Sequence, residues 1–474
     1  MNVLFCTSEA LPFAMSGGLG DVAGALPKAI KNRRVACRVV MPLYGDIKQE
    51  FRDKMTFVTE FHVPVGWRNQ YCGVFQTTVD GVIYYLLDNE YYFKRKGLYG
   101  FYDDGERYAF FSRAILEMVK NIDFAPDIIH SNDWQTALVN VYINLYYRTE
   151  PKLSRVKTLF TIHNIQYQGK YGMEIMEDTL GVGANDAHIL EFGGCINFMK
   201  GAIECADKVN TVSPSYANEI LDPWFSHGLD PFLSQRVYKL SGIVNGIDYK
   251  RYDPATDKNI AKNYTAETFT AGKKACKTAL RKEFNLNVTD EPVIGMVTRL
   301  VSHKGLDLVR HVAEYILLSG MQLVLLGNGD YEYENFFNSL AARYPGQFGL
   351  YLGFKPDMAQ RIYAGSDMFL MPSKSEPCGL AQMVSLRYGT VPIVRETGGL
   401  RDTIQDSGDN LRNGFTFKRY NAHDMLDACL RAKEGYEHKD GWKVLVKRDM
   451  TQDYSWSTSA KKYIELYKDM ETMW

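Results

Sequence analysis

Two cationic side chains and one carboxylate follow short apolar runs in the second half of the chain. Arg299 and Lys304 come after the run Val293–Val297, and Glu376 comes after the run Met368–Met371. Open α/β sheets bind ligands at the carboxyl ends of their strands. Arg has a planar fork of donors and Lys is a point charge, so together they could hold a pyrophosphate. A carboxylate nearby could accept hydrogen bonds from sugar hydroxyls or stabilise a developing cation.

The segment around the carboxylate has the residue types of a ligand-binding turn. It reads Glu376-Pro377-Cys378-Gly379-Leu380, where Pro377 fixes φ and Gly379 opens backbone N–H groups toward a ligand. Two structural alternatives stay open on these residues alone. The cations could belong to a solvated basic loop, and the carboxylate could serve only a helix dipole.

A short glycine motif occurs twice. Ser16-Gly17-Gly18-Leu19-Gly20-Asp21 recurs as Thr397-Gly398-Gly399-Leu400-Arg401-Asp402, and each copy precedes a possible helix. A Gly-Gly turn at a helix start lets backbone N–H groups approach an anion, although both copies could be plain tight turns. Neither copy has the Gly-x-Gly-x-x-Gly or Walker spacing, so neither predicts a dinucleotide or P-loop site. Two such turns favour two facing α/β domains with a ligand between them.

Polar clusters also follow two apolar runs in the first half. His163 and Asn164 come after Lys157–Ile162, and the segment His130-Ser131-Asn132-Asp133-Trp134 comes at the end of another run. No Ser or Cys nucleophile is near His163 in the sequence, so a triad hydrolase is not supported. His-Glu-x-x-His and Asp-x-Asp patterns are absent, so no metal site is predicted. Each His could also be purely structural.

The elements that would position these residues alternate along most of the chain. Apolar runs of four to seven residues are each followed by a segment compatible with a helix, which is typical of buried parallel strands. The expected strands are Asn2–Thr7, Val35–Met41, Val82–Asp88, Asp127–Ser131, Lys157–Ile162, Lys208–Val212, Val293–Val297, Met321–Gly327, Gly349–Leu352, Met368–Met371 and Val391–Val394.

One region departs from this pattern. Met55–Asp88 alternates between apolar and polar residues and contains Val79-Asp80-Gly81-Val82, which is a two-residue hairpin signal, so we expect an antiparallel ribbon there. A domain boundary is expected near Gly246, because the polar segment Asp253–Lys274 separates the two sets of strands.

Composition limits the class of protein. The 474 residues suit one to three domains, and 46% hydrophobic and 23% charged residues are usual for a globular chain. With 55 Lys+Arg against 56 Asp+Glu, the formal net charge is −1, which argues against a nucleic-acid partner. No apolar run approaches a membrane span, and the first residues lack a basic leader. Eight scattered cysteines predict reduced thiols and a cytoplasmic location.

The motifs, taken in their order and spacing, resemble those of bacterial glycogen synthases and plant starch synthases. The matching segments extend over nearly the whole chain and are Ser16–Val22, Gln168-Gly169, Asn197–Gly201, Val212-Ser213-Pro214, Asn245–Asp248, Arg299–Gly305, Glu376–Leu380 and Thr397–Thr403. The resemblance implies an α/β fold of the GT-B type, with two Rossmann-like domains facing a deep interdomain cleft. Residues 1–245 would form the acceptor-side domain, 246–455 the nucleotide-sugar domain, and 456–474 a helix returning to the first domain.

The resemblance also implies an activity. This family transfers glucose from a nucleotide sugar, usually ADP-glucose in bacteria, to the 4-hydroxyl at the non-reducing end of an α-1,4-glucan. The transfer retains the anomeric configuration and needs no metal or other cofactor. By resemblance, Arg299 and Lys304 would neutralise the leaving diphosphate, and Glu376 would hold the glucosyl unit near the reacting carbon.

Further roles come from the resemblance alone. His163 and Asn245 would contact the outer hydroxyls of the sugar, and Tyr99 and Asp133 would face the donor sugar or the acceptor. The remaining donor-binding positions would be Gly18, Asp21, Gly379, Leu380, Thr397 and Gly398.

The chain departs from the family pattern in one important place, because Met15 stands where the family usually has Lys. Smaller departures are Ser226, where Gly is common, and Phe354, where an aromatic hydroxyl is common. An active ADP-glucose-dependent α-1,4-glucan synthase is the leading hypothesis. The alternatives are a catalytically weakened glucan-binding paralogue and a related retaining glycosyltransferase with another donor or acceptor. The base of the donor nucleotide stays open.

Overall fold

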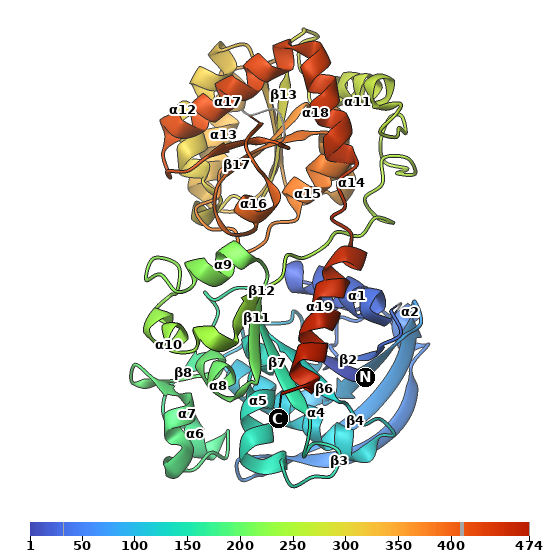
Figure 1. Ribbon diagram of the computed structural model, residues 1–474, viewed down its shortest axis with the longest axis vertical. Coiled ribbons are helices and arrows are strands. Elements are labelled where there is room, and N and C mark those ends of the chain that lie inside the picture. Colours follow the sequence, from blue (N-terminus) through green and yellow to red (C-terminus); the bar gives the residue numbers. More distant parts are fainter. Residues whose placement is uncertain (32, 408–411, 474) are drawn as a thin grey trace. The chain divides into compact units, whose positions relative to one another are not determined.

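The chain forms two α/β units, each built on its own largely parallel sheet (Figure 1). The computed structural model describes residues 1–31, 33–407 and 412–473. Unit 1 comprises Met1–Val212, Ala217–Ile243 and the segment from Trp456, and unit 2 comprises Ser213–Tyr216 and Val244–Ser455. The predicted two-domain α/β class is confirmed. The chain passes from unit 1 to unit 2 after Ile243, beside the boundary expected after residue 245.

The sheet of unit 1 has the strand order β12-β11-β7-β6-β1-β2-β5-β4-β3. The strands from β12 to β5 in this order are parallel, whereas β4 is antiparallel to both β5 and β3. Their bounds are β1 Asn2–Cys6, β2 Ala36–Pro42, β3 Thr56–Val65, β4 Arg68–Val79, β5 Val82–Asp88, β6 Ile128–Asn132, β7 Lys157–Ile162, β11 Lys208–Thr211 and β12 Leu240–Gly242. A small antiparallel sheet contains β8 Lys170–Tyr171, β10 Cys195–Asn197 and β9 Glu191–Phe192.

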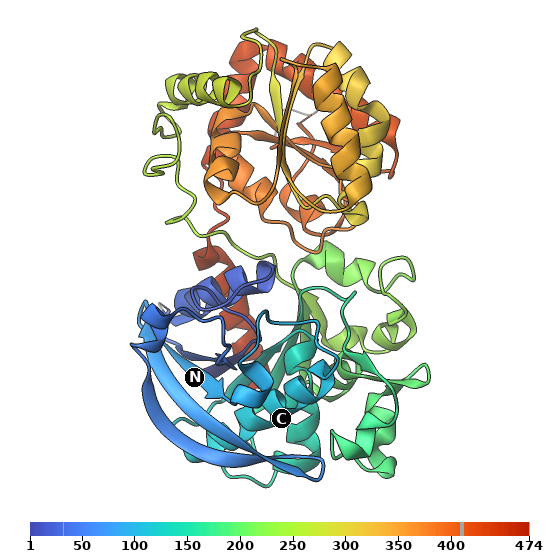
Figure 2. The same cartoon turned by 180° about the vertical axis from the view of Figure 1, so that it is seen from behind.

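The antiparallel ribbon expected within Met55–Asp88 is present, and its long strands curve along one edge of unit 1 (Figure 2). The turn between β4 and β5 is made by Asp80 and Gly81, whose φ values are 50° and 79°. Two central residues with positive φ match the twist of the strands that they join, so Asp-Gly suits this turn.

The helices of unit 1 are α1 Gly18–Lys31, α2 Gln49–Arg52, α3 Glu90–Phe93, α4 Asp104–Asn121, α5 Leu138–Tyr142, α6 Ile175–Asp178, α7 Ala187–Leu190, α8 Phe198–Cys205, α10 Asp230–Ser234 and α19 Trp456–Glu471. Helix α9 (Pro214–Glu219) contributes residues to both units. The last helix, α19, packs beside α1 (Figure 1). The guanidinium of Arg33 donates to the carbonyl oxygen of Ser457 at 3.0 Å, and Tyr467 contacts the buried His130. This is the returning helix that the resemblance implied.

The sheet of unit 2 is wholly parallel among the described residues, in the order β15-β14-β13-β16-β17-β18. The strands are β13 Val293–Val297, β14 Gln322–Gly327, β15 Phe348–Leu352, β16 Met368–Met371, β17 Val391–Arg395 and β18 Phe415–Phe417. The helices are α11 Phe269–Glu283, α12 Leu306–Leu318, α13 Tyr331–Arg343, α14 Pro356–Gly365, α15 Ala381–Arg387, α16 Gly398–Thr403, α17 Ala422–Glu437 and α18 Lys439–Met450. Figure 1 shows α12, α13 and α17 on one face and α11, α14, α15 and α18 on the other.

Every strand expected from an apolar run is present, with small differences at the ends. The strands that went unpredicted are short: β8, β9, β10, β12 and β18 each have two or three residues. Such a segment holds too few residues for a period to be seen, and its pairing depends on the neighbouring strand.

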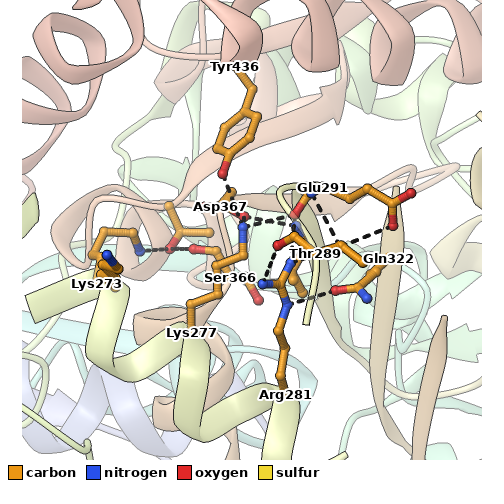
Figure 3. A network of polar contacts seen from close by, with 12 residues as sticks. Lys273, Lys277, Arg281, Thr289, Glu291, Gln322, Ser366, Asp367 and Tyr436 are labelled. Carbon is orange, nitrogen blue, oxygen red and sulfur yellow. Dashed lines mark hydrogen bonds and ion pairs between the residues drawn. The ribbon is translucent and has the colours of Figure 1, made fainter. Parts of the chain in front are cut away.

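A buried network of hydrogen bonds and an ion pair connects α11 to the amino ends of the unit 2 strands (Figure 3). Lys273, Lys277 and Arg281 are spaced by four residues, so they lie on one face of the helix. Lys277 forms an ion pair with Asp367 at 2.6 Å, and Arg281 donates to the side-chain oxygen of Gln322 at 2.9 Å. The network therefore stabilises the edge of the sheet opposite to the one at which its strands end.

Candidate active site

A pocket of about 220 Å³ lies at the carboxyl ends of the neighbouring strands β13 and β16 in unit 2. Its walls include the three residues that the sequence analysis placed first, Arg299, Lys304 and Glu376. Gly379 and Leu380 line it as well. These residues follow two different strands, and the parallel order of the sheet brings them to one edge, as predicted.

Lys304 and Glu376 form an ion pair in this pocket. The ammonium donates to both carboxylate oxygens, at 2.9 and 2.7 Å, and the hydroxyl of Ser373 donates to one of them at 2.9 Å. Burial alone would raise the pKa of Glu376, but the attraction of Lys304 and the hydrogen bonds that it receives hold that pKa below its usual value. Glu376 is therefore a charged acceptor at neutral pH.

Arg299 brings a second cation to the same pocket. Its side chain is exposed, and the chain reaches it directly after β13. Glu376 balances the charge of Lys304. The net charge of the pocket is therefore positive, and it comes from Arg299. A bound anion would meet two donors of different shape, a planar fork and a mobile ammonium.

The second glycine motif supports the loop that carries Glu376. Gly398 has a φ of 45°, and a Cβ there would lie 2.0 Å from the carbonyl oxygen of Glu376. The amide of Gly399 donates to the carbonyl oxygens of Glu376 and Pro377, at 3.1 and 3.2 Å. Thr397 is fully buried beside them. The close approach of two backbone segments thus explains this Gly-Gly pair. The N–H of Gly399 is hydrogen-bonded within the protein, whereas the sequence predicted a turn whose N–H groups would bind an anion.

Asn245 lies beside the same loop, since its backbone N–H faces the sulfur of Cys378. The Asn245 side chain is buried, and its Oδ1 atom has no hydrogen-bond partner within the described residues. A buried amide oxygen without a partner is costly and usually has a functional explanation. This observation suits a residue that contacts a ligand.

The first glycine motif, in unit 1, is exposed at Ser16, Gly17 and Gly18 and lies beside a carboxylate. The backbone N–H groups of Ser16 and Gly17 donate to Glu9, in the second case at 3.4 Å. Burial raises the pKa of Glu9, although these two hydrogen bonds oppose the increase. Nothing lies within 4 Å of the position that a Cβ on Gly18 would take, so the turn is open at that residue. Asp21 follows in the first turn of α1.

Met15 lies against the same helix. A Cβ on Gly20 would come within 2.6 Å of the Met15 side chain, so the thioether arm packs over that glycine. The Met15 side chain is still 40% exposed. A longer polar side chain at position 15 could therefore reach solvent.

His163 and Asp133 lie at the ends of the adjacent parallel strands β7 and β6. Asp133 has a φ of 57°, and its carboxylate accepts the backbone N–H of His163 at 2.7 Å. Such a φ in a residue other than Gly is uncommon and is found often at functional sites. Burial raises the pKa of Asp133 to about 7, and the negative charge of Glu9 acts in the same direction. Asp133 therefore holds a proton at a higher pH than an exposed Asp does.

The tautomer of His163 follows from its neighbour Asn132. The Asn132 amide nitrogen donates to the carbonyl oxygen of Cys6 at 3.0 Å, so its Oδ1 is the acceptor for Nε2 of His163 at 2.9 Å. Nδ1 of His163 is then an acceptor. Burial lowers the pKa of His163 to about 3, so the ring is neutral at pH 7. It can orient a hydroxyl but brings no positive charge.

Tyr99 belongs to the same region, because burial and the nearby charges of Glu9 and Asp133 raise the pKa of its hydroxyl. That hydroxyl is also hydrogen-bonded to the hydroxyl of Ser8 at 2.7 Å. His130 does not belong to this region: it is buried within β6, where its two ring nitrogens contact Tyr467 and Thr161 at 2.8 and 2.7 Å. His130 is therefore structural, which is the alternative that the sequence left open for each of the two histidines.

Sequence reasoning missed Glu9 and Ser373, and it named Asn132 only as part of the polar segment His130-Ser131-Asn132-Asp133-Trp134. Each follows or ends a strand at its carboxyl end, which was the signal used for the other residues. Their hydrogen-bond partners identify them, and no pattern of residue types predicts those pairs: Ser16 and Gly17 for Glu9, Glu376 for Ser373, and His163 for Asn132. The residues that the structure describes hold no group of three or more His, Cys, Asp or Glu side chains suited to a metal ion. Nor does any helix in that part of the chain have the length and apolar character to cross a membrane.

Comparisons with known proteins show which sequences this chain is similar to. Residues 2–235 match the family of starch synthase catalytic domains, and residues 278–444 match the group 1 glycosyl transferases. The chain is 50% identical to a glycogen synthase of Bacillus anthracis, over 99% of this chain and all of that one. It is 49% identical to a glycogen synthase of Clostridium perfringens, with 99% and 98% covered.

Two solved structures extend the comparison. The catalytic domain of starch synthase IV from Arabidopsis thaliana, bound to ADP and acarbose, superposes with a TM-score of 0.90 and 33% identity, covering 100% of this chain and 99% of that one. A sucrose-phosphate synthase from Thermosynechococcus elongatus superposes with a TM-score of 0.62 at 16% identity, covering 99% and 98%, and shows a shared fold alone.

Proposed function

The chain belongs to the starch and glycogen synthase family, and we propose that it transfers glucose from ADP-glucose to the 4-hydroxyl at the non-reducing end of an α-1,4-glucan, with retention of the anomeric configuration. The observation that carries this proposal is the pocket in which Arg299, Lys304 and Glu376 meet. A pair of cations beside a buried carboxylate suits a reaction in which a diphosphate leaves a sugar.

The cations act on the leaving group. As the bond from the anomeric carbon to the diphosphate lengthens, negative charge grows on the phosphate oxygens, and Arg299 and Lys304 are already in place to stabilise it. Lys304 then shares its ammonium between the phosphate and Glu376. The bond from the anomeric carbon to the acceptor oxygen forms, and the released ADP takes up the proton of the 4-hydroxyl.

The other residues bind the sugar. Glu376, held ionised, accepts hydrogen bonds from the glucosyl hydroxyls near the reacting carbon. His163 accepts a hydrogen bond from a sugar hydroxyl through Nδ1. The buried Oδ1 of Asn245, which has no hydrogen-bond partner among the described residues, accepts another. Asp133 and Tyr99 face the donor sugar or the acceptor. Gly379 and Leu380, which line the pocket, bind the donor through their backbone.

The remaining donor contacts fall on the two glycine motifs. Gly18 and Asp21 would bind the donor from the exposed turn at the start of α1. Thr397 and Gly398, which are buried, would act mainly by holding the loop of Glu376 against the donor.

The proposal includes no metal or other cofactor, since charge on the leaving group is met by side chains. It places the protein in the cytoplasm, because all eight cysteines are free thiols and six of them are buried. Its partners are the sugar nucleotide and the glucan, and neither a nucleic acid nor a membrane is among them.

A donor panel tests the proposal directly. The purified protein is given glycogen as primer and radiolabelled ADP-, UDP- or GDP-glucose, and label in the polymer is measured. ADP-glucose is expected to give the highest kcat/KM, with the label released by an enzyme specific for α-1,4 bonds. Binding of glucan without transfer from any donor would show a paralogue that has lost activity, and preference for another sugar nucleotide would reassign the donor.

A further inference from the structure

The carboxylate of Glu376 has a second hydrogen-bond donor that does not depend on Lys304. The hydroxyl of Ser373 donates to Oε2 of Glu376 at 2.9 Å, and Ser373 is only 2% exposed. Ser373 follows β16 and lies three residues before Glu376, on the same loop. A buried hydroxyl bonded to a charged acceptor holds that acceptor in one orientation.

The backbone of this loop is in turn held by Arg395, the last residue of β17. Its guanidinium donates to the carbonyl oxygen of Lys374 at 2.8 Å and lies 3.4 Å from that of Ser373. The guanidinium also lies over the ring of Tyr420, 5.6 Å from its centre. The amide of Lys374 donates to the carbonyl oxygen of His303 at 2.9 Å, which joins the loop of Glu376 to the loop of Lys304.

We propose that Ser373 and Arg395 are positioning residues of the transfer reaction: Ser373 holds the carboxylate of Glu376 while Lys304 turns to the leaving diphosphate, and Arg395 fixes the loop that presents Ser373. This inference rests on the proposed function. Lys304 contacts both oxygens of Glu376. A diphosphate competes for that ammonium, so the carboxylate would lose its main partner at the moment of reaction unless another donor kept it in place.

Ser373→Ala tests the first half. The variant is expected to lower kcat for ADP-glucose about tenfold, with a KM changed less than twofold, because the hydroxyl acts when the charge of Lys304 is shared. The acidic limb of the kcat–pH profile is expected to move to higher pH, since Glu376 loses a hydrogen bond that favours its ionised form. Ser373→Thr keeps the hydroxyl and is expected to restore both kcat and the profile.

A matched control removes a buried hydroxyl of the same unit. Ser385 is fully buried in α15, and its hydroxyl donates to the carbonyl oxygen of Gln382 at 2.8 Å. Ser385→Ala is expected to lower Tm about as much as Ser373→Ala does, with kcat per folded molecule and the pH profile unchanged. The proposal is overturned if Ser373→Ala keeps the wild-type kcat and profile, or if Ser385→Ala shows the same loss.

Arg395→Lys tests the second half. Lys keeps the charge but has no planar fork, so it cannot hold the carbonyl oxygen of Lys374 in the same geometry. We expect kcat per folded molecule to fall at least fivefold and the acidic limb to shift in the same direction as in Ser373→Ala. An unchanged kcat in Arg395→Lys and also in Arg395→Met would remove Arg395 from the proposal. If the wild-type protein transfers no glucose at all, the proposed function fails instead, so the two failures are distinguishable.

Discussion

The ammonium of Lys304 lies 2.9 and 2.7 Å from the two carboxylate oxygens of Glu376, so these two site residues are paired with each other. The Lys304 and Glu376 side chains are 19% and 10% exposed, so little solvent screens their interaction. A single substitution at either position therefore leaves a charge without its partner, and stability and activity change together. Separating the two effects needs the double variant.

We predict that Lys304→Met, with Glu376 left in place, lowers kcat about 10²–10³-fold, as expected when a preorganised charge is removed from a leaving group. It should also destabilise the fold by about 3 kcal/mol at pH 8, because a buried carboxylate loses its cation. The double variant Lys304→Met with Glu376→Gln should recover most of the stability and none of the activity. Urea unfolding and steady-state kinetics check both parts.

Arg299→Ala separates activity from stability in a single variant. Because the Arg299 side chain is exposed, we expect a stability change within about 0.5 kcal/mol. A fall in kcat of at least a hundredfold should accompany it. Near-full activity with an unchanged Tm would mean that Arg299 has no part in the reaction.

Met15→Lys is predicted to raise kcat/KM for ADP-glucose about tenfold, which corresponds to ~1.4 kcal/mol of transition-state stabilisation. The thioether at position 15 cannot donate a charged hydrogen bond, whereas Lys can. The 40% exposure of Met15 indicates that an ammonium there would stay solvated, so Tm should change little. A lower kcat/KM together with a lower Tm would show that the site has repacked around the apolar side chain.

Chelation provides a test of the metal-free reaction. Activity is expected to be the same after dialysis against EDTA as before it, because side-chain cations meet the charge of the diphosphate. Loss of activity that added Mg²⁺ or Mn²⁺ restores would contradict this expectation. A parallel assay at several ADP-glucose concentrations separates a loss of donor binding from a loss of turnover.

The network at α11 gives a prediction about stability alone (Figure 3). Asp367 accepts the ammonium of Lys277 at 2.6 Å and the backbone N–H of Val293 at 2.8 Å. Asp367→Ala removes this acceptor from both donors and should lower the free energy of unfolding by about 2–3 kcal/mol. Glu90→Ala, at an ion pair whose partners are 68% and 66% exposed, is the control and should cost less than about 0.5 kcal/mol. Since the network lies at the amino ends of the strands, kcat per folded molecule should stay at the wild-type value.

Asp449 supplies a prediction about pH. It is 1% exposed in α18, neither of its carboxyl oxygens has a hydrogen-bond partner among the described residues, and burial raises its pKa well above the usual value. As pH rises past the ordinary carboxyl pKa, the unfolded chain gives up this proton while the folded protein keeps it, so stability falls. Asp449→Asn removes that loss and should raise Tm more at pH 8 than at pH 5. Asp440→Asn, at a fully exposed position of the same helix, should change Tm about equally at the two pH values.

The sequence alone was sufficient for the longer strands and for the residues that follow them. A buried parallel strand is a continuous apolar run, so β13, β16 and β7 could be located from neighbouring residues only. Their direction then placed Arg299, Lys304 and Glu376 at carboxyl ends, where ligands bind. Asp80-Gly81 indicated a hairpin for an equally local reason, because few residues accept two successive positive φ values.

Only the tertiary structure decided how those residues are used. The pairing of Gly399 with the carbonyl of Glu376, the tautomer of His163 set by Asn132, and the donor that Ser373 offers to Glu376 each depend on how loops from different strands, or separate parts of one loop, are folded against one another. Burial acts in the same way, since it makes His163 neutral although its residue type allows a charge. Residue types are written along the chain, whereas hydrogen-bond partners and desolvation arise only when separate strands and loops pack together, so the chemistry of this site became specific at that stage.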